Sequence, residues 1–179
     1  MVMMKTISII WQGKGGEGIK TAAELLARGV NETKYFAQSF PEYGPERAGA
    51  KISVYIRISD REIKSHYPIE SADIMVSTID DISDYDLQTI YILLGSKLKK
   101  LKNKIYIPAI AMAQKYDSAY INMAMLGANL AVLEKYFSLP LKIIISGIEK
   151  KLHDKYSVSQ SKLNLNLIRT SINQTKNIL

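Results

Sequence analysis

A glycine-rich turn near the amino terminus is the stretch whose residue types and spacing are best suited to chemistry. Residues 7–18 read ISIIWQGKGGEG, an apolar run that leads into Gly13, Gly15, Gly16 and Gly18. The spacing fits G-x-G-x-x-G between a strand and an amphipathic helix, where the motif gathers backbone N–H groups at a helix N-terminus. Such a turn can bind an anion, approach a partner chain closely, or let strand and helix pack together.

A dinucleotide site at this turn would need a ribose-binding carboxylate about 20 residues further on, at the end of the second strand. That strand, expected over residues 35–40, carries no acid at its end, and the nearest acid is Glu42, beyond a proline. Glu17 also lies inside the turn and competes with an anionic ligand for the helix N-terminus. Both features disfavour a nucleotide site, and a stand-alone oxidoreductase that binds NAD(P) or a flavin is the alternative interpretation.

The loop at residues 41–50, PEYGPERAGA, is the second stretch with chemical potential. Its two prolines and two glycines predict a structured loop that displays Tyr43, Glu46 and Arg47. Arg47 can grip a phosphate or a carboxylate in a bidentate way, or it can pair with Glu46 and hold the loop. In a parallel sheet, this loop and the glycine turn would leave the carboxyl ends of adjacent strands, where ligands usually bind.

The elements that position these residues follow from hydrophobic periodicity. Strands are predicted at about 5–12, 35–40, 51–58, 72–79, 90–94 and 104–107, with a short edge segment at 62–64. Helices are predicted at about 17–30 and 120–137, followed by two more for which Ser138 and Ser159 are the expected N-caps. The expected fold is α/β: a single Rossmann-like domain over residues 1–179, with a mostly parallel or mixed sheet flanked by helices and a helical C-terminal third.

Composition narrows the class of protein. The 179 residues carry a net charge of +7, which favours acidic partners, but the lysine-rich run at 97–104 lacks stacking aromatics and indicates a solvated face rather than a nucleic-acid site. The absence of cysteine excludes disulfides and thiolate-ligated iron–sulfur clusters in this chain, and His66 and His153 are too isolated to predict a metal site. The amino terminus does not resemble a signal peptide, and the longest apolar run, at 121–133, is too short to cross a membrane. We therefore expect a cytoplasmic protein.

Five motifs occur in order over about residues 5–130, and together they carry a family resemblance. They are G-x-G-G-x-G, Y-G-x-E-R-x-G, R-I-S-D, an A-D strand and N-x-x-M-L-G, at 13–18, 43–49, 57–60, 72–76 and 122–127. The set resembles the gamma subunit of 2-oxoacid:ferredoxin oxidoreductases of the pyruvate or branched-chain type. The chain departs from the family pattern at Glu17, where glutamine is usual, and at Ala48, where a second arginine is usual.

The resemblance implies a complex that oxidatively decarboxylates a 2-oxoacid to an acyl-CoA and passes electrons to ferredoxin. It implies alpha, beta and delta-type partner subunits that carry thiamine diphosphate with Mg and the iron–sulfur clusters, whereas this chain binds no cofactor alone. From the residues themselves we expect no nucleic-acid or membrane partner, and a homodimer of the isolated chain stays open. The residues expected at the subunit interface, the shared active site or the coenzyme A region are Gly13, Gly15, Gly16, Glu17, Gly18, Tyr43, Glu46, Arg47 and Asn122.

Overall fold

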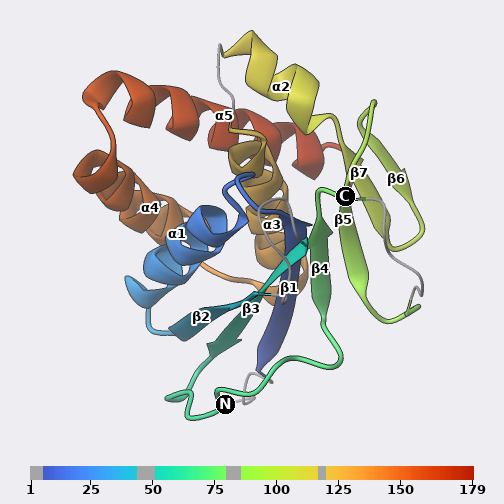
Figure 1. Ribbon diagram of the computed structural model, residues 1–179, viewed down its shortest axis with the longest axis vertical. Helices are drawn as coiled ribbons and strands as arrows, with labels where there is room; N and C mark the ends of the chain where they lie inside the picture. Colours follow the sequence, from blue (N-terminus) through green and yellow to red (C-terminus); the bar gives the residue numbers. More distant parts are fainter. Residues whose placement is uncertain (1–5, 44–50, 80–85, 117–119) are drawn as a thin grey trace.

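The computed structural model describes residues 6–43, 51–79, 86–116 and 120–179. The described strands form one seven-stranded sheet in the order β2-β3-β1-β4-β5-β7-β6 (Figure 1). The strands are β1 (Ile7–Lys14), β2 (Phe36–Tyr43), β3 (Lys51–Ser59), β4 (Ile74–Ser77), β5 (Ile90–Leu94), β6 (Lys99–Leu101) and β7 (Lys104–Ile107). The helices are α1 (Ile19–Asn31), α2 (Ala109–Lys115), α3 (Ile121–Phe137), α4 (Leu141–Lys155) and α5 (Val158–Lys176).

The sheet is mixed, as the sequence allows. Strands β1, β4, β5 and β7 run parallel, whereas β3 is antiparallel to both of its neighbours, β1 and β2. The expectation that the strands before the two loops are adjacent is wrong, because β3 lies between β1 and β2. Strands β1 and β2 still end at the same end of the sheet, since Gly13 and Tyr43 both pair with Ile52 of β3.

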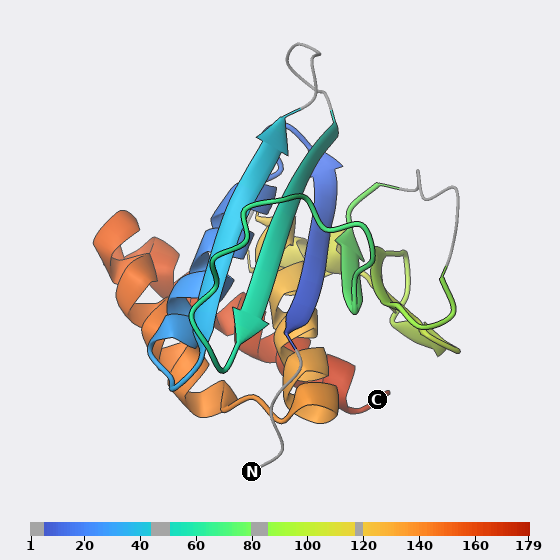
Figure 2. The same cartoon turned by 90° about the horizontal axis from the view of Figure 1, so that it is seen from below.

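Helices cover one face of the sheet in two layers (Figures 1 and 2). Helix α1 packs on β1, β2 and β3, α3 packs on β5 and β7, and α4 and α5 lie outside them. The predicted alternation in β3 places Val54, Ile56 and Ile58 in this core. On the opposite face, Figure 2 shows the segment that joins β3 to β4 crossing the sheet, and its Ile69 is buried against Ile10 and Tyr55.

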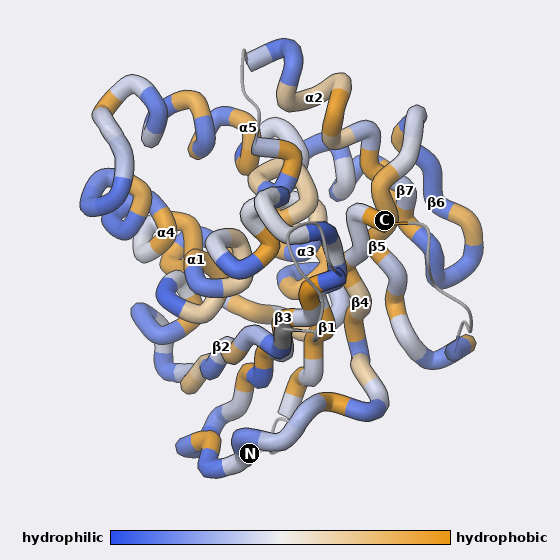
Figure 3. The backbone as a smooth tube through the Cα atoms, in the orientation of Figure 1, coloured by the Kyte–Doolittle hydropathy of each residue, from blue (hydrophilic) through white to orange (hydrophobic). Residues whose placement is uncertain are grey.

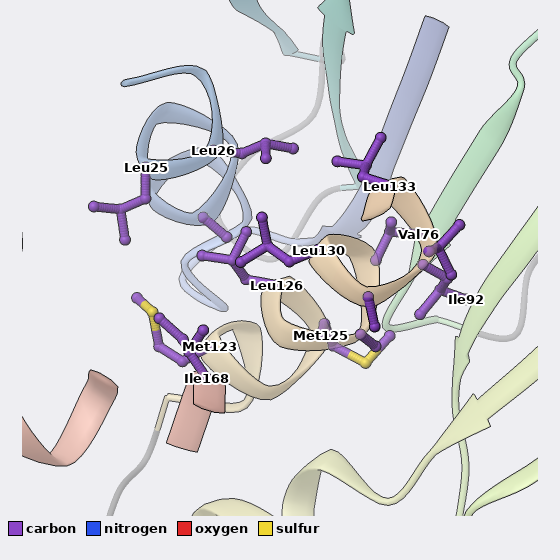
Figure 4. Packing of buried hydrophobic residues seen from close by; sticks show 14 of the residues in the cluster. Leu25, Leu26, Val76, Ile92, Met123, Met125, Leu126, Leu130, Leu133 and Ile168 are labelled. Atoms are coloured by element: carbon purple, nitrogen blue, oxygen red, sulfur yellow. The ribbon is translucent and has the colours of Figure 1, made fainter. Parts of the chain in front are cut away.

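Helix α3 lies at the centre of the helical layers. Every residue from Asn122 to Leu133 is buried, as expected for a helix that is apolar all round. Figure 4 shows its side chains meeting those of α1, of β4 and β5 and of α5. Figure 3 shows hydrophilic residues on the outer turns of α4 and α5, and also along β6. Helix α3, which opens with the N-x-x-M-L-G motif, therefore packs against the sheet on one side and against α1 and α5 on the others.

Several predicted boundaries differ from the structure for local reasons. Ser138 is not the N-cap of α4 but the left-handed C-cap of α3, with φ 54°, and Pro140 precedes the first turn of α4. Ser157, not Ser159, caps α5, because its hydroxyl accepts a hydrogen bond from the Gln160 N–H at 3.3 Å.

The two edges of the sheet were also predicted incompletely. Strand β2 continues through Pro41, which an edge strand tolerates because its missing N–H has no ladder partner to lose. The lysine-rich run contains strand β6, paired with β7 across a turn at Lys102, and lysines are typical of exposed edge strands. Residues 62–64 form no strand.

Candidate functional site

The glycine turn joins β1 to α1 at the carboxyl edge of the parallel strands. Gly16 and Gly18 adopt φ values of 94° and 74°, and Gly18 is the left-handed N-cap of α1. Residues with a Cβ atom rarely adopt such positive φ values, so both positions suit glycine. Gly13 is needed for space, because a Cβ there would lie 2.5 Å from Thr78 Oγ1 and 2.6 Å from Ile19. The turn thus allows strand, helix and the end of β4 to approach closely.

The Glu17 carboxylate lies inside this turn and binds to the protein itself. One of its oxygens accepts a hydrogen bond from the Lys14 N–H at 2.9 Å and another from the Thr78 hydroxyl at 2.5 Å. Thr78 follows β4 directly and is only 7% exposed. In a phosphate-binding turn such donors face a ligand anion. Here a carboxylate of the same chain already accepts from them.

Asn122 supports the turn from the first turn of α3. Its side chain is 1% exposed, and Nδ2 donates a hydrogen bond to the Gly18 carbonyl at 2.9 Å. A Cβ on Gly18 would lie 2.6 Å from that nitrogen. Two helix starts, those of α1 and α3, are therefore held together by this one side chain.

The structure brings some of the predicted site residues together and leaves others undescribed. The glycines, Glu17 and Asn122 form one cluster, and Tyr43 ends β2 at the same edge of the sheet. Glu46 and Arg47 lie outside the described residues, as does Ala48. The arrangement of the second loop around the turn therefore stays a prediction.

Two polar clusters escaped the sequence-based prediction. Thr78 could have been found from its position after a buried strand that ends beside the glycine turn. The second cluster lies on the face that the described helices leave uncovered, where the Tyr55 hydroxyl donates to Glu42 Oε2 at 2.5 Å. Burial, and then the Glu42 carboxylate, raise the pKa of Tyr55 to about 12. No sequence pattern links these two residues, because they meet only across paired strands.

Arg57 anchors the connecting segment on the same face. Its Nη2 donates to the carbonyls of Tyr67 at 2.6 Å and Pro68 at 3.4 Å, and its guanidinium lies 5.4 Å from the centroid of the Phe40 ring. The arginine of the R-I-S-D motif therefore fixes the segment that joins β3 to β4 and does not face an open site.

Within the described part of the chain, no group of three His, Asp or Glu side chains is arranged to hold a metal ion. His66 Nδ1 lies 2.6 Å from Gln38 Nε2, and His153 is exposed on α4. Searched over the same ranges, the helices include none that is both long and apolar enough to cross a bilayer.

Comparison with protein families gives a match over most of the chain. A family model described as pyruvate ferredoxin/flavodoxin oxidoreductase matches residues 8–174. Pyruvate synthase subunit PorC of Thermotoga maritima is 39% identical over 75 residues, which cover 42% of this chain and 39% of that protein. In these sequence matches the chain thus spans about two fifths of the length of the PorC proteins.

A longer match is the common gamma subunit of pyruvate/ketoisovalerate oxidoreductases from Thermococcus litoralis. It is 28% identical over 185 residues, covering 94% of this chain and 97% of that protein.

Solved structures share the fold. The crystal structure of PORC from Thermotoga maritima superposes with a TM-score of 0.73 at 23% identity, over 95% of this chain and 97% of that one. A 2-oxoglutarate:ferredoxin oxidoreductase from Magnetococcus marinus also gives 0.73, at 16% identity, over 98% of this chain but 32% of that one. The same fold therefore occurs both as a short chain and within a much longer one.

Proposed function

The chain belongs to the pyruvate ferredoxin/flavodoxin oxidoreductase family, and from this premise we propose that it is the gamma subunit of a 2-oxoacid:ferredoxin oxidoreductase. The substrate would be pyruvate or a branched-chain 2-oxoacid, in line with the names of its relatives. In this role the chain supports the coenzyme A-dependent oxidative decarboxylation that the assembled complex performs in the cytoplasm.

The residues present do not fit the iron–sulfur clusters of such a complex. The sequence has no cysteine to ligate an iron–sulfur cluster, and the described residues include no candidate metal site for the magnesium of thiamine diphosphate. We therefore assign the clusters, thiamine diphosphate and magnesium to alpha, beta and delta-type subunits, which pass the electrons to ferredoxin. In this proposal, the chain contributes packing surfaces and polar contacts to the assembled complex.

The observation that carries the proposal is the glycine turn filled by Glu17. Its carboxylate accepts from the Lys14 N–H and the Thr78 hydroxyl, so a phosphate would meet an occupied and negatively charged turn. A turn in this state suits close approach of a partner chain. Coenzyme A, if it contacts this subunit, would then be bound by other groups, of which Tyr43, Glu46 and Arg47 are our candidates.

The strand order argues against the alternative, a stand-alone oxidoreductase that binds a dinucleotide. In a dinucleotide-binding βαβ unit, the strand after the first helix lies beside the first strand and parallel to it. Here β3 separates β2 from β1, so the end of β2 is one strand too far from the glycine turn to hold a ribose.

Reconstitution tests the proposal. The full chain is co-expressed with alpha, beta and delta-type subunits of the family, and 2-oxoacid-dependent ferredoxin reduction is measured with and without it. We expect turnover only when the chain is present, and no saturable binding of NAD, NADP, FAD or FMN to the chain alone at micromolar concentrations. Undiminished turnover without the chain, or tight nucleotide binding, would contradict the proposal.

In the same assay, Arg47→Ala should lower turnover more than it lowers assembly, because a bidentate anion contact in the active-site region would be lost. The exposed Lys135→Ala in α3 removes one positive charge elsewhere and serves as the control. Unchanged turnover of Arg47→Ala at saturating coenzyme A would leave that loop only its structural role.

A further inference from the structure

Over residues 36–41, the exposed edge of the sheet at β2 is closed to strand addition except at one residue. The side chain of Asn31 accepts from the Ala37 N–H at 2.6 Å and donates to the Ala37 carbonyl at 3.0 Å, so it takes the place of a neighbouring strand. Pro41 has no N–H to offer. Edge strands are commonly protected in such ways against unwanted pairing.

Ser39 lies between these two protected positions and has the same backbone orientation as Ala37. In an antiparallel pair, alternate residues point both backbone groups away from the partner strand, so the N–H and C=O of Ser39 face outward from β3 as those of Ala37 do. Over the described residues, neither group has a hydrogen-bond partner. The stretch of edge between Ala37 and Pro41 therefore offers room for one β-bridge, not for a full strand.

A cleft of about 490 Å³ runs along this part of the edge, between β2, α1 and α4. Figure 1 shows α1 lying between α4 and the edge strand β2. Ser39 lines the cleft together with Arg28 of α1 and Lys151 of α4. Both cations lack an ion-pair partner within the described ranges, whereas Glu24, the acid of the cleft, lies 3.8 Å from Lys20. The cleft thus combines surplus positive charge with an open backbone pair.

We propose that this cleft receives a short, extended, acidic segment of a partner subunit in the oxidoreductase complex, an inference that rests on the proposed function. One residue of the segment forms the β-bridge with Ser39. Carboxylates beside it pair with the Arg28 guanidinium and the Lys151 ammonium group. Asn31 on one side and Pro41 on the other limit the contact to a few residues, and the net charge of +7 agrees with an acidic partner.

Charge reversal of the cleft tests this surface. The double variant Arg28→Glu, Lys151→Glu is compared with the wild-type full chain for binding to the remaining co-expressed subunits, at several salt concentrations. We expect the dissociation constant to rise about tenfold or more, with a weaker dependence on salt, because attraction becomes repulsion. The control, Lys142→Glu with Lys162→Glu, changes the net charge equally at exposed positions of α4 and α5.

Ser39→Pro is the second variant, since it removes the open N–H and leaves the charges of the cleft in place. This variant too should bind the remaining subunits more weakly. The melting temperature of the isolated variant chain shows whether it folds. Wild-type affinity and salt dependence in the charge-reversed chain would overturn the docking surface alone. A wild-type chain that does not bind those subunits at all would overturn the proposed function as well.

Discussion

The Glu17 carboxylate accepts hydrogen bonds from groups 3 and 61 positions away in the chain, the Lys14 N–H and the Thr78 hydroxyl. A glutamine, usual in the family at this position, would have the same shape, and its side-chain oxygen could accept from both groups as Glu17 Oε2 does. The departure therefore adds a negative charge to the turn without changing its geometry. At the scale of the residue, the charge of Glu17 and its hydrogen bonds are therefore two separate effects. Substitution by glutamine removes only the charge, whereas substitution by alanine removes both.

Glu17→Gln is expected to change the free energy of unfolding by less than about 1 kcal/mol, because the amide can replace both hydrogen bonds. Glu17→Ala should lower it by about 1–2 kcal/mol, since the Lys14 N–H and the Thr78 hydroxyl lose their acceptor. Urea unfolding of the full chain measures both. The control is Glu24→Ala, which removes an exposed acid of α1 paired with Lys20 and should have an effect below about 0.5 kcal/mol. Equal stability of the alanine variant and the wild type would show that the carboxylate does not hold the turn.

Tyr55 makes stability depend on pH in the alkaline range. Its pKa is about 12 in the folded protein, against 10.0 for an unperturbed tyrosine, so above pH 10 the unfolded chain loses this proton first. The stabilisation from the protonated hydroxyl is therefore complete below pH 10 and is lost as the pH rises towards 12. The free-energy difference between wild type and Tyr55→Phe, about 1 kcal/mol near pH 8, should shrink across that interval.

Urea unfolding at a series of pH values from 8 to about 11.5 checks this dependence. Tyr67→Phe is the matched control, because the Tyr67 side chain is 78% exposed and its removal should leave the pH profile unaltered. A constant difference between wild type and Tyr55→Phe at all pH values would contradict the raised pKa.

At the scale of elements, the contact between α3 and α5 depends on the absence of a side chain. A Cβ at Gly127 would lie 2.4 Å from the Ile168 carbonyl oxygen and 2.7 Å from the Ser171 Cβ. The Ser171 hydroxyl donates to the Ala124 carbonyl one turn away, which fixes the two helices at this crossing. Because α3 also carries Asn122, any shift of α3 reaches the glycine turn.

Gly127→Ala should lower the free energy of unfolding by about 1–3 kcal/mol, because the backbone of α5 must move to accept the methyl group. In a helix without such a contact, the same substitution would stabilise by about 1 kcal/mol. Thermal unfolding of the full chain gives the sign directly. Lys135→Ala, at an exposed position of the same helix, should be nearly neutral. A stabilised Gly127→Ala variant would show that the helices have room to adjust.

At the scale of the molecule, the order of the strands decides how its edges and faces can be used. Insertion of β3 between β1 and β2 separates the end of β2 from the glycine turn by one strand and places β2 at the border of the sheet. The other border strand, β6, presents Lys99 and Lys100, which disfavour pairing with another strand. Contacts with other chains are therefore expected through side chains, loops and the single β-bridge at Ser39 rather than through addition of a full strand.

Features that depend on neighbours along the chain could be predicted from the amino-acid sequence. The apolar runs at 90–94 and 104–107 predicted β5 and β7 with their observed bounds, and the glycine spacing predicted a strand–turn–helix unit. The five ordered motifs indicated the family that the match over residues 8–174 then confirmed. Local periodicity and backbone preferences suffice for such predictions.

Which distant groups meet depends on the tertiary structure. Glu17 contacts Thr78 across 61 positions, and Asn122 reaches Gly18 across 104. Both contacts exist only because β4 and α3 lie against the glycine turn. The strand order is equally non-local, because a period of two residues shows which face of a strand is buried but not which strand lies beside it. A turn whose sequence is typical of nucleotide binding is therefore closed by a residue of its own, for reasons that only the packing of distant elements supplies.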